Sequence, residues 1–258
     1  MATATEPESR LTKDQQAELI TLLEGADSAE LKLTVPESQQ LAAASGLGMD
    51  PLDAQLRLVY FFDTPDLTLN TNGVVVRARR VQGKGEDSVV KLRPVVPSEL
   101  PAKLRKLPDF GVEVDAMPGG FVCSASLKRA LPKPCVRDSV AGRAPLRKIF
   151  SKEQRALFAK HAPEGIELDK LSVLGPIMVL KLKFSPPDFA RKLVAELWLY
   201  PDNTRVLELS TKCAPSETFE VAAEARSYLE GRGLTTGGEQ QTKTHKALEF
   251  FAARLAAA

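Results

Sequence analysis

Hydrophobic and polar residues alternate over short segments along most of this chain. Neighbouring side chains of a strand point to opposite faces, so a period of two predicts strands with one apolar face. The alternation predicts strands over residues 29–35, 55–62, 73–81, 87–95, 110–116, 171–173, 177–184, 192–199 and 205–211. Turn-forming Gly, Asn and Pro residues separate many of these segments, which favours antiparallel pairing.

Helices are predicted where the apolar spacing lengthens to that of an α-helix. These segments are Lys13–Glu24, 121–131, 151–161, 216–231 and 242–255. Ser151 followed by Gln154 has the form of a capping box. No repeat or linker divides the rest of the chain, so we expect an α+β protein with an N-terminal helical extension, 1–27, and one domain, 28–258.

The charged residues on the predicted strands are sorted by strand, and most strands carry a pair of the same sign. On each strand they occupy alternate positions and therefore share one face. The charged faces carry Glu30 and Lys32, Arg77 and Arg79, Lys91 and Arg93, Glu113 and Asp115, Lys181 and Lys183, and Glu208 beside Ser210. An exposed surface usually mixes the two signs, so this sorting distinguishes the set from an ordinary sheet.

Two arrangements explain the sorted faces. One is a solvated sheet face over an apolar core, which is the simpler explanation for any single strand. The other is a closed barrel with a charged lumen, whose apolar outer wall is covered by helices. Like charges inside a lumen require a ligand of opposite charge. We favour the charged lumen, and lysine and arginine facing a few carboxylates predict binding of polyphosphate with a divalent cation.

Composition excludes several other classes. The 258 residues carry 35 Lys plus Arg against 33 Asp plus Glu, a balance that argues against a DNA-binding coat. The longest apolar stretch, 171–180, is interrupted by Gly175-Pro176 and is too short to span a membrane. The first ten residues have no apolar core, and the three cysteines are dispersed. We therefore expect a cytoplasmic location.

The residues around the third predicted strand match a known pattern. The segment reads Tyr60-Phe61-Phe62-Asp63-Thr64-Pro65-Asp66-Leu67, followed by Leu69, Gly73 and Val76-Arg77-Ala78-Arg79. Further matches are Lys91, the acidic pair Glu113 and Asp115, and Thr242-Lys243-Thr244 before the last helix. Over residues 28–255 the chain resembles the CYTH, or triphosphate tunnel metalloenzyme, superfamily.

This resemblance implies an eight-stranded antiparallel β-barrel, a tunnel that binds triphosphate, with Mg²⁺ or Mn²⁺ as cofactor. Catalysis would fall to Glu30, Lys32 and Lys91. Phosphates would be held by Arg77, Arg79, Arg93, Lys181, Lys183 and Lys243. The metal would be held by Glu30, Glu113, Asp115 and Glu208. Glu196 and Trp198, on the strand before Glu208, are further candidates, whereas the basic residues from Lys128 to Lys148 are expected in a solvated loop.

The chain departs from the family pattern at the carboxylates. The N-terminal Glu-x-Glu-x-Lys signature begins here with Ser28, and the late Glu-x-Glu-x-Glu strand has Val206 and Ser210 beside Glu208. Fewer oxygen ligands weaken binding of Mg²⁺.

Three functions therefore remain open. The first is a metal-dependent hydrolase of inorganic triphosphate or an organic triphosphate. The second is a non-catalytic protein that binds polyphosphate or a phosphorylated ligand, and the third is an adenylyl cyclase of the class IV type. The oligomeric state is not indicated by the sequence.

Overall fold

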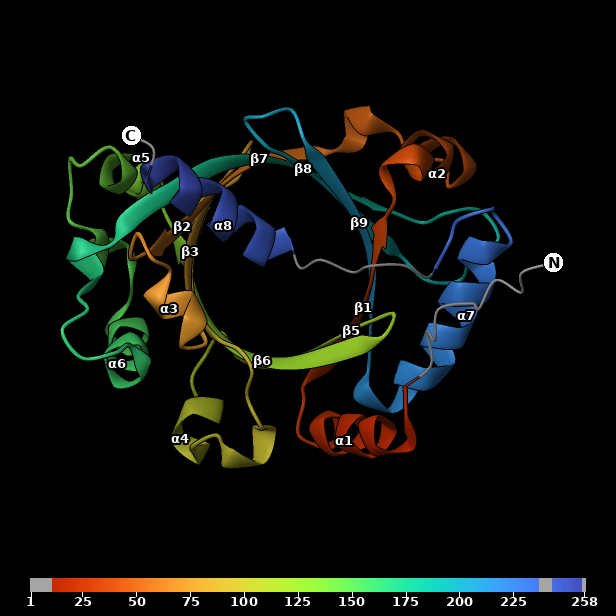
Figure 1. Cartoon of the computed structure of the whole chain (residues 1–258), viewed down its shortest axis with the longest axis horizontal. Helices are drawn as coiled ribbons and strands as arrows, with labels where there is room; N and C mark the ends of the chain where they lie inside the picture. The colour runs from red at the N-terminus through yellow and green to blue at the C-terminus, as the bar shows by residue number, and fades with distance from the viewer. Residues whose placement is uncertain (1–10, 237–242, 257–258) are drawn as a thin grey trace.

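The computed structural model describes residues 11–236 and 243–256, and within them the strands close into a barrel (Figure 1). Around the barrel the strand order is β1-β5-β6-β4-β3-β2-β7-β8-β9. The strands are β1 (Ser28–Val35), β2 (Gln55–Asp63), β3 (Val74–Val81), β4 (Glu86–Leu92), β5 (Phe110–Met117), β6 (Gly120–Leu131), β7 (Ser172–Phe184), β8 (Leu193–Leu199) and β9 (Arg205–Cys213). The expected α+β tunnel is confirmed, with nine described strands instead of eight and one parallel pair, β1 with β5.

The additional strand is β6, where the sequence pattern predicted a helix. Cys123, Leu127 and Leu131 are spaced by four residues, which fits one face of a helix and one face of a strand equally well. Here β6 pairs with β5 on one side and β4 on the other. Pairing with two neighbours outweighs local preference, so the predicted helix over 121–131 was wrong. The segments predicted at 171–173 and 177–184 form the single strand β7.

Helices lie around the outside of this barrel and across part of one end (Figure 1). They are α1 (Lys13–Glu24), α2 (Gln40–Gly46), α3 (Thr68–Thr71), α4 (Ala102–Arg105), α5 (Cys135–Val140), α6 (Lys152–His161), α7 (Thr218–Glu230) and α8 (Lys243–Ala256). The predicted capping box is present, with Ser151 accepting from the backbone N–H of Gln154. None of the helices in the described part of the chain is long and apolar enough to cross a membrane.

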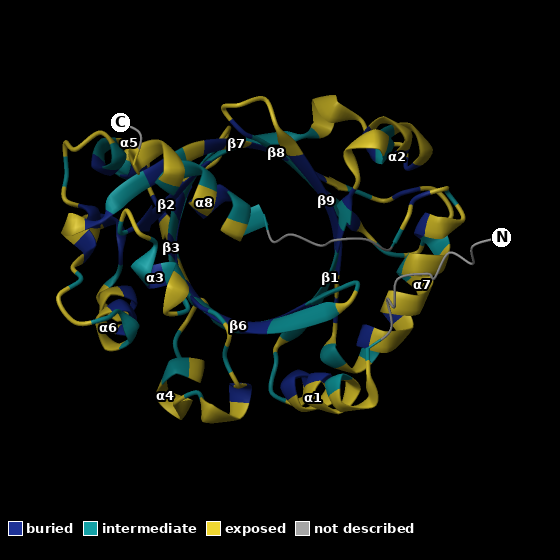
Figure 2. Cartoon of the chain, in the orientation of Figure 1, coloured by how far each residue is buried: buried dark blue, intermediate teal, exposed yellow. Residues whose placement is uncertain are grey.

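Much of the hydrophobic core lies between the barrel and these helices. Val76 and Ala78, which alternate with Arg77 and Arg79 on β3, are buried against Phe150 and its neighbours. Buried positions accordingly line the barrel wall, while the outer surfaces of the helices are exposed (Figure 2). The apolar face of β3 is thus its outer face, which leaves Arg77 and Arg79 to the lumen.

The Asp63 carboxylate, at the end of β2, organises the turn that follows this strand. It accepts hydrogen bonds from the backbone N–H groups of Thr64 (2.7 Å), Leu69 (2.8 Å) and Asn70 (3.0 Å). Leu67 lies between them in the left-handed region, at φ 60°. This carboxylate therefore fixes the turn that leads from β2 through α3 into the arginine-bearing strand β3.

Candidate functional site

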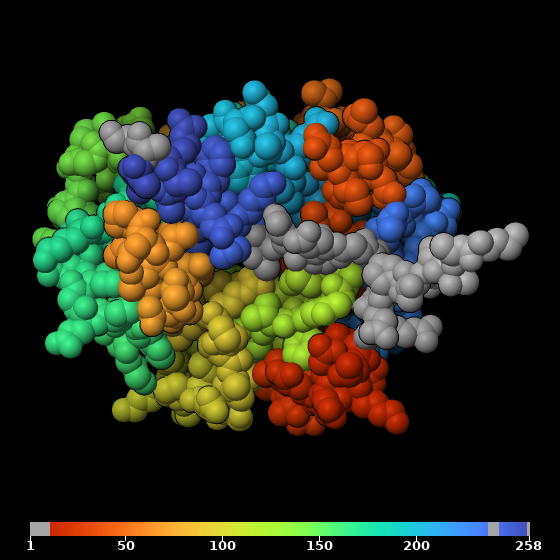
Figure 3. Space-filling view, viewed as in Figure 1, coloured from red at the N-terminus to blue at the C-terminus, as the bar shows by residue number. Residues whose placement is uncertain are grey.

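A cavity of about 210 Å³ occupies the lumen of the barrel, and its lining is strongly basic. Among the described residues, ten basic side chains line it: Lys32, Arg57, Arg77, Arg79, Lys91, Arg93, Lys128, Lys181, Lys212 and Lys243. Four acidic side chains accompany them: Glu30, Glu113, Glu196 and Glu208. α8 lies across part of one end of the barrel (Figure 3). Low-dielectric walls and an excess of one sign of charge favour entry of an anion.

On the β1 and β5 side, a buried aspartate gathers three of the cations. Asp115 is fully buried, and its carboxylate lies 2.7 Å from the Lys32 ammonium and 3.4 Å from the Arg93 guanidinium. Lys91 is 3.9 Å away, and Lys32 also contacts Glu30 at 3.2 Å. Burial alone would raise the pKa of Asp115, but Lys32, Lys91 and Arg93 hold it below its ordinary value. Asp115 therefore remains a carboxylate and anchors the cations around it.

Lys91 is the lysine of this group whose pKa is lowered. Burial lowers its pKa from 10.5 to about 8, and the attraction of Asp115 offsets only part of that effect. Near neutral pH this ammonium is charged, yet it lies close to the point at which it loses its proton. A bound anion would favour the charged form.

On the strands β8 and β9, which follow β1 on its other edge, Lys243 from α8 closes a second cluster. Its ammonium contacts Glu196 on β8 and lies 2.6 Å from Glu208 on β9. Glu196 also accepts from Lys181 at 2.7 Å and from the Trp198 indole N–H at 3.3 Å. Burial alone would lower the pKa of Lys243, but Glu196 and Glu208 raise it. Lys243 is therefore held as a cation in the lumen.

On β2 and β3, only some of the arginine N–H groups that face the lumen have a hydrogen-bond partner. Arg79 pairs with Asp87 on β4 at 2.9 Å. In contrast, the Nε atoms of Arg57 and Arg77 are buried and have no hydrogen-bond partner within the described parts of the chain. Burial, followed by the charge of Arg79, lowers the pKa of Arg77 to about 10, so Arg77 is still a cation at neutral pH. Buried Nε–H groups without a partner suit an anionic ligand that supplies the missing acceptors.

Glu30, Glu113 and Asp115 form a candidate metal site. One carboxylate oxygen from each lies within 4.8 Å of the others. Hard oxygen donors of this kind fit Mg²⁺ or Mn²⁺. Lys32 contacts Glu30 and Asp115, however, and Lys212 contacts Glu113. A divalent cation would therefore compete with the Lys212 ammonium for Glu113.

The two serines that replace family carboxylates border this acidic group. Ser28 donates to Glu113 at 3.4 Å, and Ser210 donates to Glu30 at 3.0 Å. Both hydroxyls orient the remaining carboxylates without adding negative charge. Glu208, which the sequence suggested as a fourth ligand, contacts Lys243 and is not part of this acidic group.

Most of the residues singled out from the sequence converge on the lumen. Lys183 is an exception, because it is exposed and does not line the cavity. Thr242 lies outside the described residues. Lys128 was expected in a solvated loop, but β6 carries it into the cavity lining, which corrects that prediction.

Arg57 and Lys212 also line the cavity and were not singled out. Arg57 is the one charged residue within the alternating segment 55–62, and Lys212 lies two residues beyond Ser210 on the same strand face. Both could have been predicted, because alternate positions of a strand share one face and each residue shares its face with other lumen residues.

Comparisons with known proteins agree with the fold. No protein-family model and no curated protein matches the sequence. Among solved structures, a candidate adenylate cyclase from Bacillus halodurans superposes with a TM-score of 0.59 at 13% identity, covering 85% of this chain and 97% of that one. A candidate adenylyl cyclase from Hippeastrum, described with a dominant triphosphatase activity, gives a TM-score of 0.60 at 15% identity, covering 82% and 91%.

The chain thus forms a closed barrel with a strongly basic lumen. The fold of this chain is similar to that of these two adenylyl cyclase-like structures. At these identities the likeness establishes the architecture, and activity has to be argued from the site itself.

Proposed function

We propose that this protein is a divalent-metal-dependent hydrolase of inorganic triphosphate or an organic triphosphate. The observation that carries the proposal is Arg77, a buried guanidinium in the lumen whose Nε has no partner among the described residues. Phosphate oxygens are acceptors of the right charge and geometry for such a group. The surrounding Arg79, Arg93, Lys91 and Lys181 would distribute the charge of a chain of phosphates.

In this proposal Glu30, Glu113 and Asp115 hold Mg²⁺ or Mn²⁺. When bound, the ion would neutralise phosphate charge and lower the pKa of a water molecule for attack on phosphorus. Lys32 touches two of the three carboxylates and is positioned to keep them ionised. Lys91 and Arg93, which flank Asp115, would stabilise the charge that accumulates on the phosphoryl oxygens.

A second candidate function is non-catalytic binding of polyphosphate or a phosphorylated ligand. It is favoured by Ser28 and Ser210 at positions where the family pattern has carboxylates, and by the ammonium of Lys212 on Glu113. These features weaken a metal site while leaving the basic lining intact. The third candidate is the adenylyl cyclase already left open by the sequence, in which a ribose hydroxyl would replace water as the nucleophile, and both structural neighbours are described as candidate cyclases.

Calorimetric titration with tripolyphosphate, with and without Mn²⁺, tests these functions when phosphate release is assayed on the same samples. Tight binding with metal-stimulated release is the result we expect. Tight binding that is indifferent to Mn²⁺ and gives no release would favour the binding protein. Incubation with ATP that yields cyclic nucleotide and pyrophosphate would favour the cyclase. Absence of binding would overturn the proposal.

Arg77→Met provides the matched variant for this titration. It removes the guanidinium but retains an unbranched side chain of similar length, so it separates charge from packing. We expect tripolyphosphate affinity to fall by about tenfold or more, since a charge-assisted hydrogen bond contributes roughly 1.5–3 kcal/mol. Trp198, the one tryptophan in the sequence, lies in the cavity lining and offers a fluorescence signal for the same titration.

A further inference from the structure

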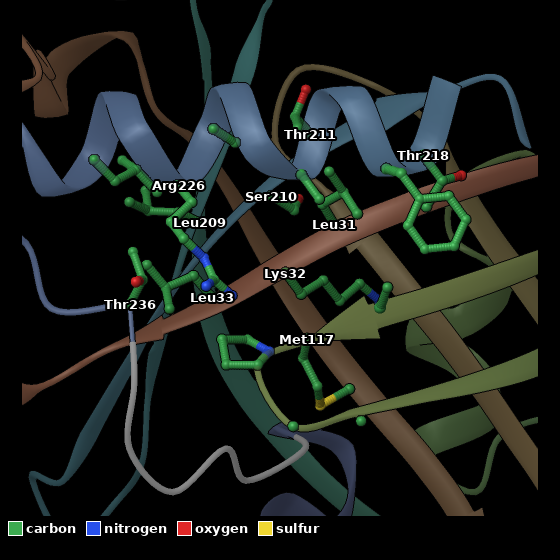
Figure 4. Close-up of a pocket in the computed structure, with 18 of the residues that line it drawn as sticks. Leu31, Lys32, Leu33, Met117, Leu209, Ser210, Thr211, Thr218, Arg226 and Thr236 are labelled. Carbon is green, nitrogen blue, oxygen red and sulfur yellow. The ribbon is translucent and has the colours of Figure 1, made fainter. Parts of the chain in front are cut away.

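A second cavity, of about 190 Å³, lies outside the barrel wall and has a different character from the lumen. It lies between α7 and the outer faces of β1 and β9 (Figure 4). Its lining is largely apolar and includes Leu19, Leu31, Leu33, Leu209, Phe219 and Leu229. A cavity of this kind suits an apolar group, because burial of such a group removes hydrocarbon from water.

The apolar cavity and the basic lumen adjoin one another. Lys32 and Met117 line both of them. Figure 4 shows Leu31 and Thr218 between β1 and α7, and Lys32 and Met117 on the other side of β1. A ligand that reaches Lys32 from the lumen is therefore at the entrance to the apolar cavity.

The strand register explains this connection. In the described structure β1 pairs with β9 from Ala29 to Val35, whereas its pairing with β5 runs from Ser28 to Leu31. β5 ends at Met117, and the chain turns back through Pro118 and Gly119 into β6. The β5 edge of β1 beyond Leu31 thus faces a turn, and residues 117–120 of that turn line the apolar cavity.

We propose that the ligand is an amphiphile: a triphosphate that carries an apolar organic group. Its phosphates occupy the basic lumen beside Lys32, and its apolar group passes Met117 into the cavity beneath α7. This inference rests on the proposed function, because the anionic end uses the same lumen, and it adds the class of the organic substituent. The cavity contributes hydrocarbon contacts, and the lumen contributes the charge.

Three probes of graded structure test the inference by calorimetry: inorganic tripolyphosphate, methyl triphosphate and hexyl triphosphate. The two alkyl esters have the same charge, so their difference reports the hydrocarbon alone. We expect hexyl triphosphate to bind about tenfold more tightly or better, since burial of its methylene groups removes hydrocarbon from water. Equal affinities for the two esters would overturn the inference while leaving the proposed function intact. Failure of all three probes to bind would overturn both.

Variants of α7 test where the hexyl group lies. Ala222 and Ala225 line the cavity. The double variant Ala222→Leu with Ala225→Leu would fill the cavity with leucine side chains, and leucine is a good helix former. We expect this variant to lose the advantage of hexyl triphosphate and to bind methyl triphosphate as the original protein does. Ala223→Leu is the matched control, because Ala223 is exposed on the same helix and does not line the cavity. A hexyl advantage that survives filling would overturn the assignment of this cavity.

Discussion

Glu196 on β8 and Glu208 on β9 lie directly opposite each other in the strand register, inside the barrel. Two carboxylates placed this way repel each other. Lys243, at the first position of α8, contacts both of them. The last helix therefore contributes a cation to the interior of the barrel, and its packing and the charge balance of the lumen depend on each other.

Replacing Lys243 with Met should destabilise the protein by about 3–5 kcal/mol, because two largely buried carboxylates would lose their shared cation. Urea unfolding at neutral pH measures the change. Lys152→Met, at an exposed position of α6, is the control and should have little effect. If both variants unfold at the same urea concentration, Lys243 does not hold this cluster together.

Replacing Lys212 with Met should strengthen metal binding. The substitution removes the ammonium that contacts Glu113 and leaves the three carboxylates of the candidate metal site in place. We expect Mn²⁺ affinity, measured by electron paramagnetic resonance of the free ion, to rise by about tenfold or more, since a neighbouring cation opposes a second one. The exposed Lys192→Met serves as the control. An unchanged Mn²⁺ affinity would show that the contact of Lys212 with Glu113 does not oppose metal binding.

Strand parity made much of the site predictable from the sequence. Charges at alternate positions placed Arg77, Arg79, Lys91 and Arg93 on one face, and the cavity lining confirms that face as the inner one. The rule works because a strand has only two faces and the apolar one must be covered. The same rule also explains why Lys183 was misleading: its face is right, but it lies near the exposed end of β7.

The hydrophobic pattern within one segment could not predict contacts between segments that are distant in the sequence. The strand β6 owes its conformation to β4 and β5, and its own sequence fits helix or strand. The contact of Lys212 with Glu113 joins strands that are far apart in the sequence. The apolar cavity under α7 depends on where the β1–β5 pairing stops, and no periodicity within β1 marks that point.

Replacing Ser210 with Glu tests whether the missing carboxylate limits the metal site. The Ser210 hydroxyl lies 3.0 Å from a Glu30 oxygen, so a carboxylate introduced there would join the acidic group. We expect Mn²⁺ to bind about tenfold more tightly and metal-stimulated phosphate release from tripolyphosphate to increase. Ser210→Gln has the same size without the charge and should produce neither effect. A glutamate variant that binds Mn²⁺ no better than the glutamine variant would contradict the assignment.

The pKa of Lys91 predicts how phosphate binding depends on pH when metal is removed with a chelator. Its value of about 8 in the folded protein is below the ordinary 10.5, so the folded state releases this proton first as pH rises. Tripolyphosphate affinity should therefore decline through about pH 8, as the ammonium becomes neutral. Folding stability should change in the opposite direction, because the cost of burying the charged lysine, present below pH 8, is relieved between about 8 and 10.5. Calorimetry from pH 7 to 9.5 on the original protein and on Lys91→Met separates this group from the ionisation of tripolyphosphate, which both proteins share. The variant should bind more weakly at pH 7 and lack the step near pH 8, and identical pH profiles for the two proteins would show that Lys91 does not contact the anion.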